Sequence, residues 1–357
     1  MSFFKPFASR KAIVGVDIGT TSIKIAEMEK VDEKVRLITY GLLEDNIYLE
    51  RFNEALQTSN LKLSEDKATR YLSTLLSRVH MSAETVIASI PSFLVFSTLI
   101  ELPSTSDSEI KRVMELQAKQ YIPLPLSAVT LDWLKIGERD GATSQKKSQI
   151  LLVAIPNEQI ERYHKIFSVL GLKLRSVEAE GMSLARSITL NNKDTSIIID
   201  IGSRSSSFSV ARGGFFMMGG QTDFSGGSLT QSIAKGLTIS QRRAEDLKRE
   251  RGLKGYGGQH ELSTLMTPML DVIISEAKRI ISSFENAYGD KITRVLISGG
   301  GANLLGIEDY FNRYFGLPAK RVNPFLGLQY DSSLEPMVKS TGPLLSVALG
   351  LGMKEFI

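Results

Sequence analysis

The stretch GVDIGTTSIKIAEM, residues 15–28, carries one carboxylate, Asp17, inside an apolar run and follows it directly with Gly-Thr-Thr-Ser. Apolar side chains alternate on both sides of this polar centre, which predicts two strands joined by a tight loop. The same design returns in IIIDIGSRSSSFSVARGG, residues 197–214, where Asp200 takes the place of Asp17. A repeat of this kind predicts two equivalent β-hairpins, one in each half of the chain.

Both loops have the composition of a phosphate-binding loop. Glycine lets the backbone turn closely enough to aim N–H groups at phosphate oxygens, and hydroxyl side chains add further donors. A phosphate-bound magnesium ion keeps several waters and needs only one or two carboxylates, so Asp17 and Asp200 are expected to hold Mg²⁺ through water. One such hairpin alone would be explained as well by an ordinary polar tip, but the duplication favours a clamp. The phosphate-contacting candidates are Gly19, Thr20, Thr21, Ser22, Gly202, Ser203 and Ser205.

A third glycine-rich element is VLISGGGANLLGIEDYF, residues 295–311. Its three glycines, Gly299, Gly300 and Gly301, stand between a buried strand and a helix that we expect Asn303 to open. The Lys-Ser/Thr pair of a Walker A loop is missing, and the spacing is not that of a dinucleotide-binding fingerprint. We therefore expect this loop to form a further part of the ligand site.

Length and composition restrict the class of protein. At 357 residues the chain exceeds what one hydrophobic core usually serves, so we expect two domains or lobes. Hydrophobic residues are 42% and charged residues 23%, which is typical of a globular protein rather than a disordered or membrane-spanning one. The net charge of +4 is spread over interleaved acids and bases, and this argues against a nucleic-acid-binding surface.

The residue types that are missing exclude several chemistries. With no cysteine in the sequence, disulfides, zinc–thiolate sites and thiol catalysis are excluded, and the three histidines lack the spacing of a metal site. No apolar run approaches the roughly 20 residues that span a bilayer. We expect a cytoplasmic protein whose first ten residues form a frayed tail, with contact to a membrane surface or a partner as the alternative.

The two Asp-Ile-Gly hairpins, about 180 residues apart and followed by Ser-Gly-Gly-Gly, resemble the phosphate loops and the adenosine loop of the actin, Hsp70 and sugar-kinase superfamily. The resemblance spans nearly the whole chain. It implies an α/β, two-lobed actin-like (ribonuclease H-like) ATPase fold with ATP and Mg²⁺ bound in the cleft between the lobes.

Two further stretches narrow the resemblance. They are ELQAKQYIPLPLSAVTLDW, residues 115–133, and ILLVAIPNEQIERYHKIFSVLGLKLRSVEAEGMSLARSI, residues 150–188. Both are similar to the PilM family, the actin-like cytoplasmic proteins of type IV pilus assembly, which are related to the division protein FtsA. The resemblance implies an FtsA-type extra subdomain (an SHS2 domain). Within it, Pro123 and Pro125 should stop a helix that begins near Asp107, and Asn157 should cap a helix that ends before Gly171.

The resemblance also divides the chain into segments. They are the first-lobe core with the first hairpin (1–82), an inserted subdomain (83–172), a connecting segment (173–193), the second-lobe core with the second hairpin (194–225), a second-lobe subdomain (226–289), the second-lobe core with the adenosine loop (290–335) and a connecting helix back to the first lobe (336–357). The small residues of GPLLSVALGLGM, residues 342–353, predict close helix packing beneath the cleft.

Four further site residues follow from the resemblance. Lys24 corresponds to a phosphate-contacting lysine, with a solvent-facing strand lysine as the alternative. Glu245 and Lys248 correspond to a pair that holds ribose and adenine, although a mixed-charge solvated helix face explains them equally well. Glu180 takes the place of a residue that orients the attacking water and is, with Asp200, a catalytic candidate; a glutamate favoured by the helix dipole is the alternative.

The function implied is an ATP-binding scaffold of the type IV pilus inner-membrane platform, which docks the cytoplasmic N-terminal peptide of the membrane protein PilN. It would lie at the inner face of the cytoplasmic membrane through its partners, with slow ATPase activity left open. Pilus motor ATPases, the platform protein and self-association are further candidates. The alternatives are an FtsA-like filament protein and a small-molecule kinase. No convincing kinase base follows Gly171, and the absence of an FtsA-like basic linker and amphipathic helix before Ile357 favours the pilus function.

Overall fold

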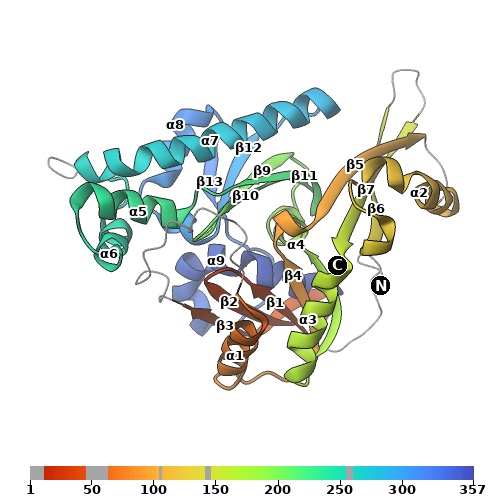
Figure 1. The fold of residues 1–357 in the computed structure, drawn as a ribbon, viewed down its shortest axis with the longest axis horizontal. Helices are drawn as coiled ribbons and strands as arrows, with labels where there is room; N and C mark the ends of the chain where they lie inside the picture. The colour runs from red at the N-terminus through yellow and green to blue at the C-terminus, as the bar shows by residue number, and fades with distance from the viewer. Residues whose placement is uncertain (1–11, 46–62, 104–106, 141–145, 255–259) are drawn as a thin grey trace.

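The computed structural model describes residues 12–45, 63–103, 107–140, 146–254 and 260–357. Within them the strands form two sheets of five strands and one sheet of three. Figure 1 shows the two larger sheets stacked one above the other, with the smaller sheet at one side. The N-terminal segment expected to fray or to touch a membrane lies outside the described residues.

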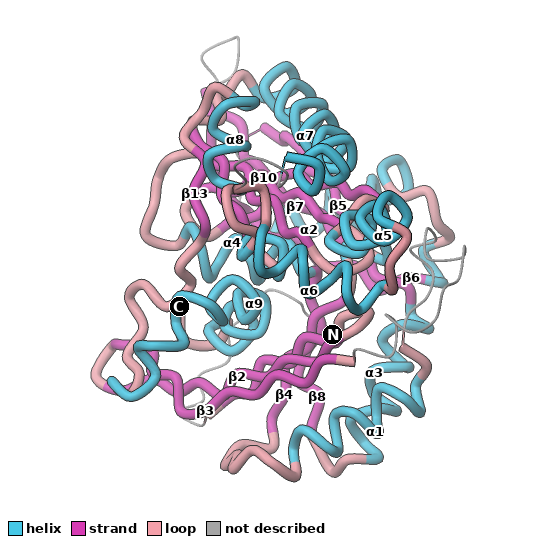
Figure 2. Tube along the Cα trace, turned by 90° about the vertical axis from the view of Figure 1, so that its left-hand side faces the viewer, coloured by secondary structure: helices cyan, strands magenta, loops and turns pink. Residues whose placement is uncertain are grey.

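The first sheet carries the first hairpin and has the strand order β3-β2-β1-β4-β8. Its first three strands are antiparallel neighbours, and β4 and β8 extend the sheet in parallel. Helices α1 and α3 cover one face and α9 packs on the other (Figure 2); the sheet with α1 and α3 is the first lobe. The elements are β1 (Ile13–Ile18), β2 (Ser22–Val31), β3 (Lys34–Glu44), α1 (Glu65–Leu76), β4 (Thr85–Ile90), α3 (Asn157–Val169), β8 (Lys173–Ala179) and α9 (Glu335–Met353).

The second sheet repeats this topology in the order β11-β10-β9-β12-β13. Again three antiparallel strands are followed by two parallel ones. Phe208 and Val210 belong to the core beneath α7, whereas Ser209 faces α4. The elements of this second lobe are β9 (Ser196–Ile201), β10 (Ser206–Arg212), β11 (Phe215–Thr222), α5 (Gly226–Leu237), α6 (Gln241–Arg251), α7 (His260–Tyr288), β12 (Arg294–Ser298), α8 (Ile307–Phe315) and β13 (Ala319–Arg321).

Two helices cross between the lobes, α9 and α4 (Glu180–Thr189). They lie so close that a Cβ atom on Gly350 would come within 2.0 Å of the Ser183 carbonyl oxygen. A Cβ atom on Gly15 in β1 would lie 2.0 Å from the carbonyl oxygen of Ala348 in α9. The close packing predicted for residues 342–353 is therefore confirmed, and it holds the connecting helices against the first sheet.

The three-stranded sheet, with helix α2 on one face, forms a separate body that we call the insert. Its strands are antiparallel in the order β5-β7-β6. Helix α2 ends before Pro123, as predicted. The insert comprises β5 (Phe96–Pro103), α2 (Asp107–Tyr121), β6 (Val129–Asp140) and β7 (Lys146–Pro156). The predicted segment 83–172 also contains β4, a strand of the first sheet, and α3, which packs on α1 and β8; the division into seven segments stays a prediction.

The expected helix cap at Asn157 is wrong. Pro156 occupies the cap position of α3, and Asn157 is the first helical residue. The side-chain oxygen of Asn157 accepts a hydrogen bond from Thr130 Oγ1 at 2.8 Å, and its nitrogen donates to the Ser127 carbonyl at 3.0 Å. Thr130 and Ser127 thus occupy both polar atoms of the Asn157 side chain. The side chain therefore stabilises the connection into β6 rather than the first turn of α3.

Candidate functional site

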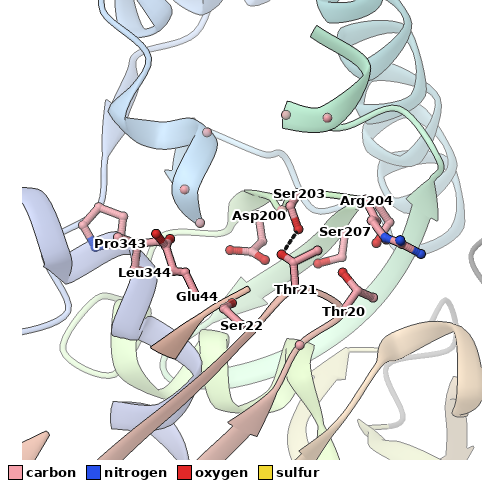
Figure 3. Close-up of a pocket in the computed structure, with 18 of the residues that line it drawn as sticks. Thr20, Thr21, Ser22, Glu44, Asp200, Ser203, Arg204, Ser207, Pro343 and Leu344 are labelled. Carbon is pink, nitrogen blue, oxygen red and sulfur yellow. Dashed lines mark hydrogen bonds between the residues drawn. The ribbon is translucent and has the colours of Figure 1, made fainter. Parts of the chain in front are cut away.

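A cavity of about 360 Å³ opens between the lobes where the two hairpins meet (Figure 3). Every site residue predicted from the sequence lines it, including those that are far apart in the chain. They are Asp17, Gly19, Thr20, Thr21, Ser22, Lys24, Glu180, Asp200, Gly202, Ser203, Ser205, Glu245, Lys248, Gly299, Gly300, Gly301 and Asn303. The structure thus brings together all three glycine-rich elements at one place.

In the first hairpin the aspartate forms an ion pair with a lysine of the same hairpin. Asp17 lies directly opposite Lys24 in the β1–β2 register, and the Lys24 Nζ atom is 3.0 Å from Asp17 Oδ2. The other oxygen of Asp17 accepts a hydrogen bond from Ser89 Oγ at 2.7 Å. Burial would lower the pKa of Lys24, but the charge and hydrogen bond of Asp17, together with the charges of Asp200 and Glu180, outweigh it and the pKa is raised. Lys24 is therefore not a solvent-facing strand lysine, because it is a buried partner of Asp17.

The second hairpin has the same geometry, but no lysine lies opposite its aspartate. Asp200 lies opposite Ser207 in β10 and beside Ser298 in β12, whose hydroxyl hydrogen-bonds to the carboxyl group. Ser207 is 9% exposed, and among the described residues its Oγ atom has no hydrogen-bond partner. Burial raises the pKa of Asp200 to about 6; Asp17 adds to the shift and Lys24 opposes it. Asp200 is thus a half-buried acid that lacks a neutralising partner on its own hairpin.

The loops of the two hairpins are equivalent and touch each other. The Gly19 amide donates to the Ser22 carbonyl at 2.9 Å, and the Gly202 amide donates to the Ser205 carbonyl at 3.0 Å. Across the cleft, the hydroxyl groups of Thr21 and Ser203 are hydrogen-bonded, as the dashed line in Figure 3 shows. This contact joins the lobes at the centre of the cavity.

Helix α5 also begins at this cavity, a feature that the sequence prediction missed. Ser225 and Ser228 form a capping box, and Gly226 and Gly227 at the helix start line the cavity. A Cβ atom on Gly227 would lie 2.4 Å from the Ser203 carbonyl oxygen, so only glycine fits against the loop. A helix N-terminus attracts anions. The signal that could have revealed it is Ser-Gly-Gly-Ser, residues 225–228, directly before a helical pattern.

Glu180 is the first residue of α4, as predicted, and faces both aspartates. Burial raises its pKa to about 8, and the negative charges of Asp17 and Asp200 add to this rise. Lys24 and the backbone N–H of Ser92 oppose the shift. At neutral pH, with no other cation in the cleft, the carboxyl group is therefore mostly protonated.

Glu245 and Lys248 of α6 form a largely buried corner of the cavity rather than part of a solvated helix face. Glu245 is 6% exposed and accepts hydrogen bonds from Lys248 Nζ at 2.6 Å and from Arg249 Nε at 2.8 Å. Burial would raise the pKa of Glu245, but Lys248 and the neighbouring donors lower it. Lys248 also donates to the Gly226 carbonyl at 2.9 Å and to Thr230 Oγ1 at 2.8 Å, so all three of its N–H groups are used within the protein.

The third glycine-rich element passes beneath the second hairpin. Gly299 has φ 75°, and a Cβ atom there would lie 2.8 Å from Asp200 Oδ1. The expectation that Asn303 opens the next helix is wrong: Asn303 ends a 3-10 turn, and α8 begins at Ile307 after Gly306. The Asn303 side chain instead donates to the Ser340 carbonyl at 2.8 Å, because the start of α9 lies within its reach.

Other lining residues were not predicted. Leu304 and the α9 residues Pro343, Leu344 and Val347 supply an apolar wall, which only the packing of α9 across the cleft brings into place. Arg204 also lines the cavity, and so does Ser207, the last residue of the hydroxyl cluster 203–207 expected to supply donors. Other additions are Glu44, Pro91, Phe93, Gln221, Leu229 and Arg249.

The donor set fits a hydrated magnesium–nucleotide group better than a bare metal ion. Among the described residues, no cluster of three or more His, Cys, Asp or Glu side chains could hold a metal. Asp200 and the unpartnered Ser207 hydroxyl nevertheless offer a half-buried acid and a free polar atom on one side of the cavity. Magnesium bound to phosphates and waters needs only such a limited set of protein groups.

Among the described residues, no helix is both long enough and apolar enough to cross a bilayer.

Solved structures share this fold. A chain of the PilM–PilN type IV pilus biogenesis complex superposes with a TM-score of 0.79 at 19% identity, covering 98% of this chain and 100% of that one. The ethanolamine utilization protein EutJ from Carboxydothermus hydrogenoformans has a TM-score of 0.56 at 17% identity, with 98% and 92% covered. MreB5 of Spiroplasma citri, bound to AMPPNP, has a TM-score of 0.55 at 14% identity, with 97% and 96% covered.

These similarities confirm the α/β, two-lobed actin-like fold predicted from the sequence. The sequence model of a family described as type IV pilus assembly protein PilM matches residues 15–356, nearly the whole chain. The resemblance drawn from the sequence is thus confirmed. The chain belongs to the PilM family of type IV pilus assembly proteins.

Proposed function

We propose that this protein is an ATP-binding, actin-like scaffold of the type IV pilus inner-membrane platform that binds the cytoplasmic N-terminal peptide of a PilN protein. The observation that carries the proposal is the convergence of two equivalent Asp-Ile-Gly hairpins and a glycine-rich third loop on one cavity between the lobes. The fold similarity to a chain of the PilM–PilN complex supports the choice of partner.

Different residues around the cavity would bind different parts of the nucleotide. The two hydroxyl-rich loops and the start of α5 would hold the phosphate groups through hydroxyl and backbone N–H donors. Glu245, Lys248 and the apolar wall from α9 would hold ribose and base. Bound magnesium would neutralise phosphate charge. Asp200 would accept hydrogen bonds from its waters, with Asp17 contributing less because Lys24 already neutralises it.

Slow hydrolysis is consistent with the electrostatics of the cleft. Glu180 is placed to orient a water, but a carboxyl group with a pKa of about 8 is mostly protonated at neutral pH and cannot accept a proton. Cationic charge near Asp17 and Asp200 would lower that pKa and restore the ionised form. We therefore propose that the protein binds nucleotide well and turns it over slowly.

The partner would dock between the first lobe and the insert, which places the protein in the cytoplasm at the inner face of the membrane through PilN. We propose nucleotide state as a modulator of peptide affinity, which requires reciprocal coupling between the two sites. Pilus motor ATPases, the platform protein and a second copy of the chain are proposed as further partners.

Calorimetric titration with ATP and magnesium tests the nucleotide part, with phosphate release followed in the recovered sample. We expect micromolar binding by the parent protein, little release, and loss of binding in Asp200→Ala. Asp194→Ala is the matched control, because Asp194 is an exposed aspartate just before β9 and does not line the cavity. No binding by the parent would contradict a nucleotide-dependent function.

The partner part is tested separately by fluorescence anisotropy of a labelled peptide that represents the cytoplasmic N-terminus of PilN from the same organism. We expect saturable binding whose affinity changes when ATP and magnesium are added. A scrambled peptide of the same composition is the control. Equal binding of both peptides would contradict the proposed partner, whatever the outcome for ATP.

A further inference from the structure

The sheet of the insert buries both of its faces. On one face Ile150, Leu152 and Ala154 pack with α2 in a small core of their own. On the other face Leu151 and Val153 belong to the core of the first lobe. The insert is thus attached to the first lobe by continuous apolar packing as well as by its chain ends.

The same inner face also reaches the second lobe. Leu99 lies opposite Leu151 in the β5–β7 register, yet Leu99 belongs to the core of the second lobe. Ile136 of β6 packs against both cores. Strand β5 runs beside β11 of the second lobe, and Figure 1 shows α7 ending on the side of the insert. The insert therefore lies against both lobes.

Beside this apolar contact lies a polar one, which we call the seam and which is formed by Leu99, Glu101, Arg139 and Tyr288. The Arg139 guanidinium donates a hydrogen bond to the Tyr288 carbonyl at the end of α7. It also forms an ion pair with Glu101 at 3.2 Å. The Tyr288 hydroxyl donates to the Leu99 carbonyl at 3.4 Å. One arginine thus connects the insert to the last turn of the second lobe's longest described helix.

One buried amide next to the seam is unsatisfied. Gln149 lies between Glu101 and Gly137 in the register of the three strands, on the same face as Leu99. It is 1% exposed, and among the described residues neither polar atom of its side chain has a hydrogen-bond partner. Buried polar groups are almost always paired, so an unpaired amide indicates a contact that is not at its most stable arrangement.

We propose that the seam restrains the spacing of the two lobes, with Arg139 as its positioning residue, so that a peptide bound at the insert alters how firmly the cleft retains nucleotide. The geometry supports this because the insert packs on the first lobe through Leu151 and Val153, whereas on the second lobe the packing of Leu99 is supplemented by these polar bonds. A change of lobe spacing would have to break those bonds first. The link to peptide and nucleotide rests on the function proposed above.

A matched pair of substitutions separates the seam from general effects on the insert. Arg139 and Lys147 lie directly opposite each other in the β6–β7 register, and both pair with Glu101, Lys147 at 3.6 Å. Of the two, Arg139 alone bonds to the second lobe among the described residues. Arg139→Met removes the bond to Tyr288 and keeps the length of the side chain, and Lys147→Met is the control.

Lobe spacing can be measured directly, because the sequence has no cysteine and accepts site-specific labels without background. Val169 on α3 and Val272 on α7 are exposed positions, one on each lobe, at which introduced cysteines can carry spin labels. In nucleotide-free protein we expect Arg139→Met to broaden the distance distribution between the labels. Lys147→Met should reproduce the parent distribution. Equal distributions in all three proteins would overturn the proposal.

Release of a fluorescent ATP analogue gives the second readout. We expect the analogue to leave Arg139→Met about threefold faster than parent or Lys147→Met, as loss of one hydrogen bond to a charged group allows. A broadened distance distribution with unchanged release would overturn the link to nucleotide retention. If the parent binds no analogue, the proposed function fails, and the label distances alone decide whether the seam restrains the lobes.

Discussion

The two hairpins share one backbone design but differ in one side chain. In each, an aspartate is the last residue but one of the first strand, a serine of the neighbouring parallel strand hydrogen-bonds to it, and the residue seven positions later lies directly opposite. That residue is Lys24 in the first hairpin and Ser207 in the second. The two hairpins therefore share a backbone conformation, but only the first has a positively charged side chain opposite its aspartate. The first aspartate has a lysine partner directly opposite it, whereas the second has a serine in that position.

The lobes differ in a second way, between their two parallel strands. In the second lobe the chain passes from β12 to β13 through a 3-10 turn and α8, whereas in the first lobe it passes from β4 to β8 through the whole insert and α3. The insert returns to contact the second lobe. The two lobes thus share the strand topology that forms the cleft, and they differ in the segments that connect equivalent strands.

The same substitution should have opposite effects at the two aspartates. Asp17→Asn leaves Lys24 buried without its partner, and we expect the free energy of unfolding to fall by about 3 kcal/mol at pH 7. Asp200→Asn removes a half-buried unpaired charge, and we expect the nucleotide-free protein to gain about 2 kcal/mol. Urea unfolding of both variants beside the parent measures the difference. Equal destabilisation by both would contradict the asymmetry.

The gain in Asp200→Asn should also depend on pH. The folded pKa of about 6 is raised above the ordinary value of 3.8, so the contribution of Asp200 to the stability of the parent is fully present below the unfolded pKa and is lost as pH rises through 6. The variant and the parent should therefore be equally stable near pH 4 and should diverge up to about pH 7. A constant difference across this range would point to a cause other than ionisation.

Glu180 should respond in the same direction, because it lies between both aspartates. Its folded pKa of about 8 is also raised, so the parent loses stability as pH rises from the unfolded value of 4.5 through 8. Glu180→Gln imitates the protonated carboxyl group and should raise the unfolding midpoint at pH 7 by about 3 °C, with no rise near pH 4.5. Differential scanning calorimetry at the two pH values measures this, and a rise at both would contradict the assigned ionisation.

A smaller effect is expected when the second hairpin is converted toward the first. Ser207→Lys places an ammonium group opposite Asp200, in the position that Lys24 has opposite Asp17. We expect the magnesium-dependent gain in ATP affinity to fall about threefold, because the lysine takes over part of the neutralisation. Ser207→Met, of similar length without charge, is the control. If both variants behave alike, the effect is steric and not electrostatic.

Much of this site could be predicted from the sequence, because its parts are local. The duplicated Asp-Ile-Gly motif places glycine, hydroxyl and carboxyl groups at fixed distances along one hairpin, and all of these residues line the cavity. Ser207 belongs to the hydroxyl cluster of the second loop, and its position opposite Asp200 could also be inferred, since it follows Asp200 at the spacing that separates Lys24 from Asp17. The signal was the repeat itself.

The remaining parts depend on tertiary packing. The apolar wall from Pro343 and Leu344 reaches the cavity only because α9 crosses between the lobes on small residues. Asn157 and Asn303 have the residue type of helix caps, but nearby carbonyl or hydroxyl groups from other elements bind their side chains instead. The contact of the insert with the second lobe has no sequence signal, because Arg139 and Tyr288 are brought together only by the fold.

The Asp200→Asn variant gives the most direct test of the central claim, which is that the second hairpin binds the cation that accompanies the nucleotide. ATP affinity is measured by calorimetry with excess magnesium and with excess chelator, in the variant and in the parent. We predict that magnesium strengthens binding by about tenfold or more in the parent and by less than about twofold in the variant. The same magnesium-dependent gain in both proteins would contradict the account.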